Sequence, residues 1–227
     1  MITLADGTVI NQVAWGGDPW VFVIDGYGSE SEYWKWQQLI EARYPMSSVF
    51  QVLWPSGSGA KNPVHRMLRG AKDWLVWNQG GDTNYAEERA KIAGIALADY
   101  LASNTTNAVL IGHSLGCRVA AVAACDLAQR KLESPLDSVH LLGAAISRNE
   151  GWGAIKNATK HGVFNYYSEL DPFINGMYNV GTMRFSKPVG AKGFGYPLAD
   201  GHSVTDIDVT EQVGINHLAY RYKIKLS

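Results

Sequence analysis

The chain has 227 residues, of which 46% are hydrophobic, and its formal net charge is −1 at pH 7. This length fits one α/β domain or two small ones, and the hydrophobic fraction is ample for a sizeable buried core. The near-neutral charge argues against a nucleic-acid partner, because binding to phosphates needs a concentration of Lys and Arg.

The beginning of the chain, "MITLADGTVINQVAWGGDPW", has neither the basic start nor the apolar core of a signal peptide. The longest apolar run, "VAAVAAC", falls far short of the roughly 20 residues that cross a bilayer. We therefore expect a cytoplasmic protein without an integral membrane segment.

The N-terminal part of the chain predicts a βαβ unit. "PWVFVIDGYGSE" holds a short apolar run that ends in glycines, which is typical of a strand buried on both faces of a parallel sheet. "SSVFQVLWPSGSG" repeats this pattern. Between them, "SESEYWKWQQLIEARYP" opens with Ser and Glu and places Trp34, Leu39 and Ile40 at roughly helical spacing, which predicts a crossover helix.

Residues 56–85 have a different character. They contain Trp74, Trp77 and the polar stretch "NQGGDTN", with a short helical pattern in "HRMLRGAKDWLVW". We expect either a lid segment or a long loop that contains a helix.

The second half of the chain alternates again between helices and strands. A helix is predicted at "AEERAKIAGIALADYLAS", a buried strand at "NAVLIG", and further strands at "SVHLLGAA", "GVFNYYS" and "VTDIDV". A last helix or turn begins near "NHLAY", and the basic tail "YRYKIKLS" is expected to be a solvated end or an edge strand. No repeat or low-complexity linker interrupts the alternation, which favours a single domain over residues 1–227, with a mostly parallel sheet flanked by helices.

The pentapeptide "GHSLG" follows one predicted strand directly, at residues 112–116. A Gly-x-Ser-x-Gly match alone is weak, but a strand before it and a helix after it are the context of a nucleophile elbow. Gly112 and Gly116 would relieve crowding around a strained Ser114. The alanine-rich helix that follows would pack closely on the sheet, with its N-terminus beneath a developing oxyanion.

Both cysteines, Cys117 and Cys125, lie in this predicted helix. Their spacing along a helix separates the two backbones by about 12 Å, which excludes a disulfide between them. We interpret both as small buried residues. No clustered Cys/His/Asp spacing resembles a zinc or iron site, so we expect no metal and no cofactor.

These features resemble the α/β-hydrolase superfamily over nearly the full length of the chain, and "GHSLG" is a common lipase and esterase form of the elbow. The resemblance implies an α/β-hydrolase fold. The short stretch between "LLGAA" and "GVFNYYS" leaves no room for a large cap domain.

A closer resemblance is to the poorly characterised hydrolase-like family that includes the transmembrane and coiled-coil domain-containing proteins. It is carried by "GHSLGCRV", "VHLLGAA", "NYYSELDPFINGMYNVG", "KPVG" and "DIDVTEQVGINHLAY". The chain differs from the membrane-bound members in having no predicted spanning segment.

Along α/β-hydrolase chains the catalytic order is Ser, then Asp or Glu, then His, and this order selects the candidate base. Only His202 and His217 follow Asp171, the candidate acid, in the sequence. His217 comes after the last predicted strand, where the histidine of this fold belongs, whereas His202 precedes that strand. We therefore choose His217, and the alternative for it is a polar residue at the start of the last helix.

The candidate acid is Asp171, in "YYSELDPF", which follows the end of a predicted strand and can reach an imidazole from a loop. Because Asp before Pro also opens helices, an N-cap role is the alternative. Glu169 is a weaker candidate. Asp200 lies in a glycine-bounded turn, and Asp206 and Asp208 share one face of a strand, away from the histidine loop.

An oxyanion hole needs two main-chain donors. The resemblance implies that one is Leu115, directly after Ser114, and that the other belongs to the earlier loop "DGYG". We choose Tyr27 from this loop, and an ordinary turn is the alternative use of its two glycines.

Aromatic side chains near these loops are candidates for substrate binding. Tyr27, Trp54, Trp74 and Trp77 could offer apolar surface to an acyl chain, although tryptophans are more often part of the core.

The sequence thus predicts a serine hydrolase, esterase- or lipase-like, that cleaves a small-molecule or lipid-like carboxylic ester through an acyl-enzyme intermediate. Ser114 would attack, His217 would transfer the proton and Asp171 would orient the imidazole. A thioesterase or a peptidase would use the same triad. A non-catalytic interaction module that kept the fold is the alternative of another class, and the oligomeric state is left open.

Overall fold

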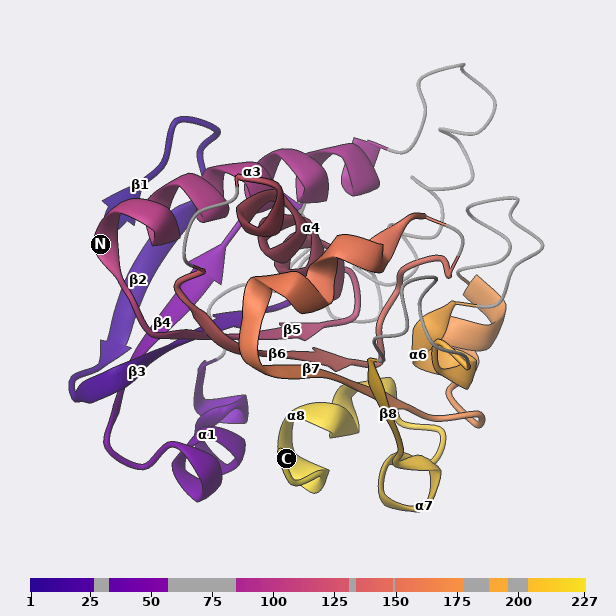
Figure 1. Cartoon of the computed structure of the whole chain (residues 1–227). Coiled ribbons are helices and arrows are strands. Elements are labelled where there is room, and N and C mark those ends of the chain that lie inside the picture. The colour runs from indigo at the N-terminus through magenta and orange to yellow at the C-terminus, as the bar shows by residue number, and fades with distance from the viewer. Residues whose placement is uncertain (27–32, 57–84, 131–133, 149, 178–187, 196–203) are drawn as a thin grey trace.

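A computed structural model describes the chain except for residues 27–32, 57–84, 131–133, 149, 178–187 and 196–203. One sheet runs through the described part (Figure 1). Its strands, in spatial order, are β1 (Ile2–Thr3), β2 (Val9–Ala14), β4 (Ser47–Leu53), β3 (Gly17–Ile24), β5 (Ala108–His113), β6 (Leu136–Leu142), β7 (Thr159–Tyr167) and β8 (Thr205–Asp208). β2 is antiparallel to both of its neighbours, and the pairs from β4 through β8 are parallel.

Helices cover both faces of the sheet. On one face lie α3 (Tyr85–Asn104), α4 (Gly116–Gln129) and η2 (Trp152–Ala158), and on the other lie α1 (Gln37–Arg43) and α8 (Tyr220–Lys223), as Figure 1 shows. The remaining helical segments are short: η1 (Tyr33–Lys35), η3 (Phe173–Met177), α6 (Val189–Lys192), α7 (Thr210–Val213) and η4 (His217–Ala219). The mostly parallel sheet between two helical layers confirms the predicted α/β class.

Each face of the sheet has its own hydrophobic cluster. The larger cluster packs under α3 and α4, and the smaller one under α1 and α8. In α4, Ala120, Ala121, Ala123 and Ala124 are all fully buried. Small side chains therefore bring α4 close to the sheet, as the alanine-rich sequence predicts.

The contact between α3 and α4 is also close. A Cβ built on Gly94 of α3 would lie 2.7 Å from Cβ of Val122 in α4, too near for any side chain without movement of the helices. This packing fixes α4 against the sheet. The position of α4 in turn sets that of Ser114 and Leu115, which directly precede it.

The predicted strands β3 to β8 are confirmed. Of the residues at helical spacing in the predicted crossover helix, Leu39 and Ile40 are buried in α1, but the side chain of Trp34 is 70% exposed and Trp36 is fully buried instead. The reason is that η1 precedes α1, and a 3₁₀ turn shifts which residues face the sheet. The tail is not a solvated end, because α8 forms within it and Arg221 is 3% exposed. The proposed lid, residues 56–85, lies almost wholly outside the described residues.

Candidate active site

Ser114 connects the end of β5 to the start of α4 with a strained backbone. Its φ is +55°, and no other non-glycine residue in the described ranges has a positive φ. Such a conformation costs a residue with a Cβ about 1–2 kcal/mol. The main chain compensates, because Ser114 donates to the carbonyl of Leu142 at 3.0 Å and its own carbonyl accepts from Ala145 at 3.1 Å.

The glycines on either side of Ser114 allow this turn. A Cβ on Gly112 would lie 2.7 Å from Cα of Cys117, and a Cβ on Gly116 would lie 2.2 Å from the carbonyl oxygen of Ile24. No side chain fits either space, so the sequence pattern around Ser114 reflects real crowding at this turn.

A third glycine, Gly26, brings another loop against Ser114. It follows β3, and a Cβ built on it would lie 2.8 Å from Cβ and 3.2 Å from Oγ of Ser114. The beginning of "DGYG" thus touches Ser114. Tyr27, the predicted second oxyanion donor, lies outside the described residues, and the predicted first donor, Leu115, directly precedes α4.

His217 and Asp171 are brought together from distant parts of the sequence. His217 begins η4, and its Nδ1 is 2.6 Å from Oδ2 of Asp171, which is fully buried in the loop after β7. Since a carboxylate only accepts, Nδ1 carries a proton, and in the neutral imidazole Nε2 then presents a lone pair. Nε2 is buried and has no hydrogen-bond partner among the described residues.

The second oxygen of Asp171 caps a helical turn. Oδ1 accepts hydrogen bonds from the main-chain N–H groups of Phe173 and Ile174 at 3.0 and 3.3 Å. The sequence presented the N-cap and the histidine partner as alternatives, but the two carboxylate oxygens make both contacts at once. These bonds fix the carboxylate from the side opposite His217.

Two rings hold the imidazole of His217. The ring of Phe173 stacks on it at 4.4 Å between centroids, and the ring of His113 lies 4.7 Å away, tilted by 36°. His113 also bonds through Nε2 to the main-chain oxygen of His217 at 2.9 Å. Because His113 directly precedes Ser114, this bond connects the segment of Ser114 to that of His217.

The described atoms form no direct hydrogen bond between Ser114 Oγ and His217 Nε2. In hydrolases with such a pair, this hydrogen bond often forms fully only when substrate is bound.

His113 is a neutral member of this group. Burial lowers its pKa well below the usual range, and the Coulombic effects of His217 and Arg221 lower it further. A neutral imidazole that donates from Nε2 has an unprotonated Nδ1. The sequence offered no role for His113 beyond its place beside Ser114.

A buried ion pair that the sequence did not suggest lies behind these residues. Arg221 Nη1 donates to Oδ1 of Asp25 at 3.0 Å, and Trp36 Nε1 donates to Oδ2 at 2.9 Å. Asp25 and Arg221 are 196 positions apart in the sequence, so only the fold shows that they meet.

The remaining predicted residues fall in three groups. Trp54 belongs to the core cluster and donates from Nε1 to the main-chain oxygen of Asp25 at 2.9 Å, so its role in substrate binding stays a prediction. Trp74, Trp77, Asp200 and His202 lie outside the described residues. The last group, which follows, comprises the rival carboxylates.

None of the described rival carboxylates is bonded to His217. Glu169 is exposed. Asp206 accepts from the main-chain N–H groups of Phe194 and Gly195 at 3.0 Å each, and Asp208 accepts from that of Thr210 at 2.8 Å. Asp206 and Asp208 thus hold local backbone.

A family model described as "Protein of unknown function (DUF726)" matches residues 80–226. The chain belongs to this family. The matched range contains Ser114, Asp171 and His217, and its description assigns no activity. Curated proteins gave no match to the chain. The resemblance to the family that includes the transmembrane and coiled-coil domain-containing proteins stays a prediction.

Solved structures give a similarity in fold. Esterase PE8 is 16% identical, with 92% of this chain and 90% of that chain covered and a TM-score of 0.47. The Bacillus cereus carboxylesterase is 15% identical, with 88% and 83% covered and a TM-score of 0.47. YbtT, a type II thioesterase from the yersiniabactin NRPS/PKS pathway, is 16% identical over 60% of this chain, with a TM-score of 0.39. The match spans 47% of YbtT, about half of its length. The chain has the α/β-hydrolase fold, and a fold does not by itself imply an activity.

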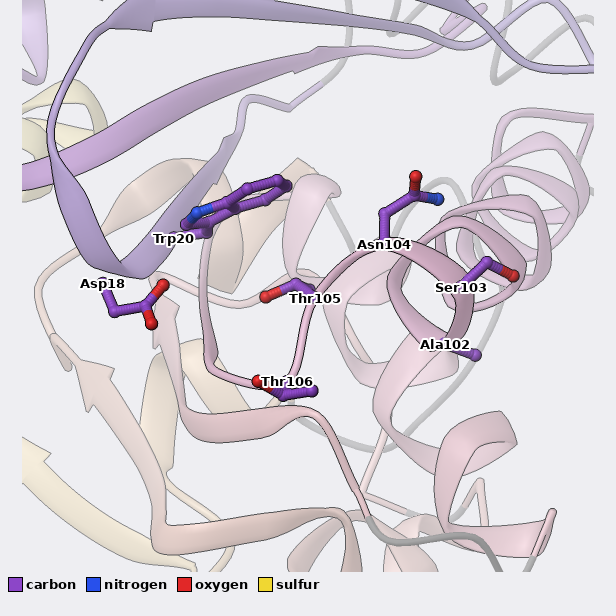
Figure 2. A pocket seen from close by; sticks show the side chains of 7 residues that line it. All are labelled: Asp18, Trp20, Ala102, Ser103, Asn104, Thr105 and Thr106. Carbon is purple, nitrogen blue, oxygen red and sulfur yellow. The ribbon is translucent and has the colours of Figure 1, made fainter.

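A separate pocket lies at the end of the sheet where the parallel strands begin, whereas Ser114 lies at the end where they finish. Its volume is about 380 Å³, and Figure 2 shows Asp18 and Trp20 of β3 facing the connection from α3 to β5. Its lining residues are Asp18, Trp20, Ala102, Ser103, Asn104, Thr105 and Thr106. These residues lie where parallel strands begin, whereas Ser114, Asp171 and His217 follow strand ends or lie beyond them. The pocket therefore plays no part in the candidate active site.

Within the described ranges, no three His, Cys, Asp or Glu side chains gather in an arrangement that would hold a metal ion. None of the helices described there combines the length and apolar character that crossing a membrane requires.

Proposed function

We propose that the protein is a serine hydrolase that cleaves carboxylic esters through an acyl-enzyme intermediate. The observation that carries the proposal is the hydrogen-bonded pair of His217 and the fully buried Asp171. Asp171 holds Nδ1 of the imidazole at 2.6 Å, and the buried Nε2 has no described partner. An imidazole fixed in this tautomer can act as a general base, and Ser114, on a strained turn, directly follows His113, which bonds to the main chain of His217.

In the first half of the proposed reaction, Ser114 Oγ attacks the ester carbonyl carbon while His217 Nε2 takes the hydroxyl proton. The tetrahedral oxyanion receives hydrogen bonds from the main-chain N–H of Leu115 and from the loop that begins at Gly26. The imidazolium, stabilised by Asp171, then protonates the leaving alkoxide, and the carbon–oxygen bond to the alcohol breaks.

In the second half, a water molecule takes the place of the alcohol. His217 Nε2 removes its proton as the oxygen attacks the acyl-enzyme, and returns that proton to Ser114 Oγ when the acid leaves. Throughout, the bonds from the Phe173 and Ile174 N–H groups hold the Asp171 carboxylate in place toward His217.

The proposal is tested by the reaction of Ser114 with a fluorophosphonate probe, followed by peptide mapping by mass spectrometry. We expect one labelled peptide, containing Ser114, and loss of labelling in Ser114→Ala and in His217→Gln. Ser103→Ala is the matched control, because Ser103 is an exposed helix residue whose hydroxyl bonds to the main-chain oxygen of Asp99. It should label as the parent does.

Absence of labelling in the folded parent protein would reject the proposal and favour the non-catalytic interaction module. A series of substrates with one acyl group joined as ester, thioester or amide defines the reaction. We expect the ester to give the highest kcat/KM, and a thioester or amide preference would overturn the ester assignment in favour of a thioesterase or peptidase.

A further inference from the structure

Asp25 is held from three directions at the end of β3. Its side chain is 4% exposed, with Oδ1 bonded to Arg221 Nη1 at 3.0 Å and Oδ2 bonded to Trp36 Nε1 at 2.9 Å. Its main-chain oxygen accepts from Trp54 Nε1 at 2.9 Å. These bonds leave the residue little freedom, and the next residue along the chain is Gly26, which touches Ser114.

The partner of Asp25 belongs to the segment that carries His217. Arg221 lies in α8, which follows η4 directly, and its side chain is 3% exposed. α8 packs on the face of the sheet opposite α3 and α4 (Figure 1). The bond between Asp25 and Arg221 therefore joins the start of the proposed oxyanion loop to the histidine segment.

His113 provides a second connection to the histidine segment. Its Nε2–H donates to the main-chain oxygen of His217 at 2.9 Å, and its Nδ1 is 3.9 Å from Oδ1 of Asp25. The first contact is a hydrogen bond, whereas the second is too long to be one. His113 thus fills the space between Asp25 and His217 and holds the main chain of the latter.

Stability alone is a weak reason for this arrangement. The desolvation of a buried ion pair offsets much of its attraction, and an apolar pair of similar volume often gives an equally stable protein. A buried charge pair does, however, fix geometry, because its bonds are directional and removing one partner is costly.

We propose that Asp25 is a positioning residue for the reaction, which sets Gly26, and with it Ser114, relative to His217 through its bond to Arg221, with His113 as the second connection. The inference rests on the proposed hydrolase function. Asp25 touches neither substrate nor reacting atoms in this scheme, so its removal should lower kcat and leave KM nearly unchanged.

The main test compares the parent with the double variant Asp25→Asn/Arg221→Met. Asn retains an acceptor for Trp36 Nε1, and Met fills the space of Arg221 without leaving a buried charge unpaired. We expect a folded protein whose kcat on nitrophenyl acetate is at least tenfold lower, with KM within about threefold of the parent. If a folded double variant keeps the parent kcat, Asp25 has a structural role only and the proposal is wrong.

A control for the loss of an Arg–Asp pair is Arg130→Met. Arg130 bonds to Asp99 and Asp126 at the far end of α4, and its removal should change kcat by less than twofold. A similar loss of kcat in this variant would contradict the positioning role, since it would show a general effect of destabilisation.

The second test uses His113. His113→Gln can still donate from Nε2 to the His217 main chain, whereas His113→Leu cannot. We expect Gln to restore kcat to within about threefold of the parent and Leu to lower it at least tenfold, with melting temperature measured for both. Equal kcat in the two variants would refute the second connection.

These outcomes separate the two proposals. A parent protein that reacts with neither fluorophosphonate nor ester refutes the proposed function itself. A parent that reacts normally, together with a folded double variant that reacts equally fast, refutes only the positioning role.

Discussion

Asp171→Asn separates the two contacts made by one carboxylate. Oδ1 accepts from the N–H groups of Phe173 and Ile174, and Oδ2 is 2.6 Å from His217 Nδ1. Asn keeps one oxygen for the helical turn but directs an N–H donor at His217, so the imidazole must change tautomer or turn away. We expect kcat to fall by about 10²–10⁴-fold.

The cost in stability follows from the same contacts. Asn loses a charge-assisted hydrogen bond to His217, which lowers the free energy of unfolding by about 1–3 kcal/mol. Asp171→Ala loses this bond and also leaves two main-chain donors without an acceptor, which costs about 1–3 kcal/mol more. The two variants should therefore have similar kcat values, whereas the free energy of unfolding should be clearly lower for the Ala variant.

The assay measures kcat on nitrophenyl acetate per folded molecule, with the folded fraction and the free energy of unfolding taken from urea titrations. If folded Asp171→Asn molecules keep the parent kcat while the protein is destabilised, Asp171 is only a helix cap and the acid must be another residue. If the Asn and Ala variants are equally stable, the cap assignment is wrong.

Three further predictions test the surroundings of the site. Ser114→Gly should be at least as stable as Ser114→Ala in urea unfolding, because φ +55° strains any residue with a Cβ, although glycine usually costs about 0.5–1 kcal/mol relative to alanine; a markedly less stable glycine variant would argue against strain. Gly26→Ala should lower kcat at least tenfold, because its Cβ would lie 2.8 Å from that of Ser114, whereas Gly153→Ala, whose Cβ meets nothing within 4 Å, should not; equal kcat in both would contradict the contact. Burial lowers the pKa of His140 to about 3 and that of His113 well below 6.5, so both are neutral when folded and take up protons on unfolding below pH 6.5. Their stabilisation is complete above that pH and is lost as pH falls; for His140 the loss is about 2 kcal/mol between pH 7 and pH 5. His140→Gln should reduce the loss measured by urea unfolding by about this amount, and an unchanged loss would contradict the assignment.

The parts of the fold that could be predicted from the sequence have local signals. Runs such as "VFVI" and "AVLIG" indicate strands buried on both faces, and β3 and β5 contain them. β2 was not predicted, because it pairs antiparallel near the edge and most of its residues are only partly buried. A strand of that kind lacks the continuous apolar run on which the prediction depended.

The residues of the candidate site likewise divide into those that have a local sequence signal and those that have none. Ser114, Asp171 and His217 were selected by their order along the chain and by the elements they follow, and His217 and Asp171 do meet. Asp25 and Arg221 could not be paired in advance, because neither lies in a motif and burial of a charged residue is not visible in sequence. A carboxylate at the end of a predicted strand, directly before "GYG", is the signal that was available.

The turn at Ser114 shows why local backbone geometry is the more predictable level. Its strain is maintained by contacts that involve glycines and main-chain atoms: Gly112 and Gly116 clear the space, and the Ser114 main chain bonds to Leu142 and Ala145. The spacing of the glycines is a property of the sequence itself, so the turn can be recognised from the sequence. The imidazole of His217, by contrast, is held by Phe173, His113 and Asp171 side chains that reach it from separate elements, and that arrangement exists only once β5, β7 and η4 are assembled. A candidate nucleophile can therefore be recognised from a short motif. The side chains that would make it reactive come together only when the strands of the whole sheet have paired.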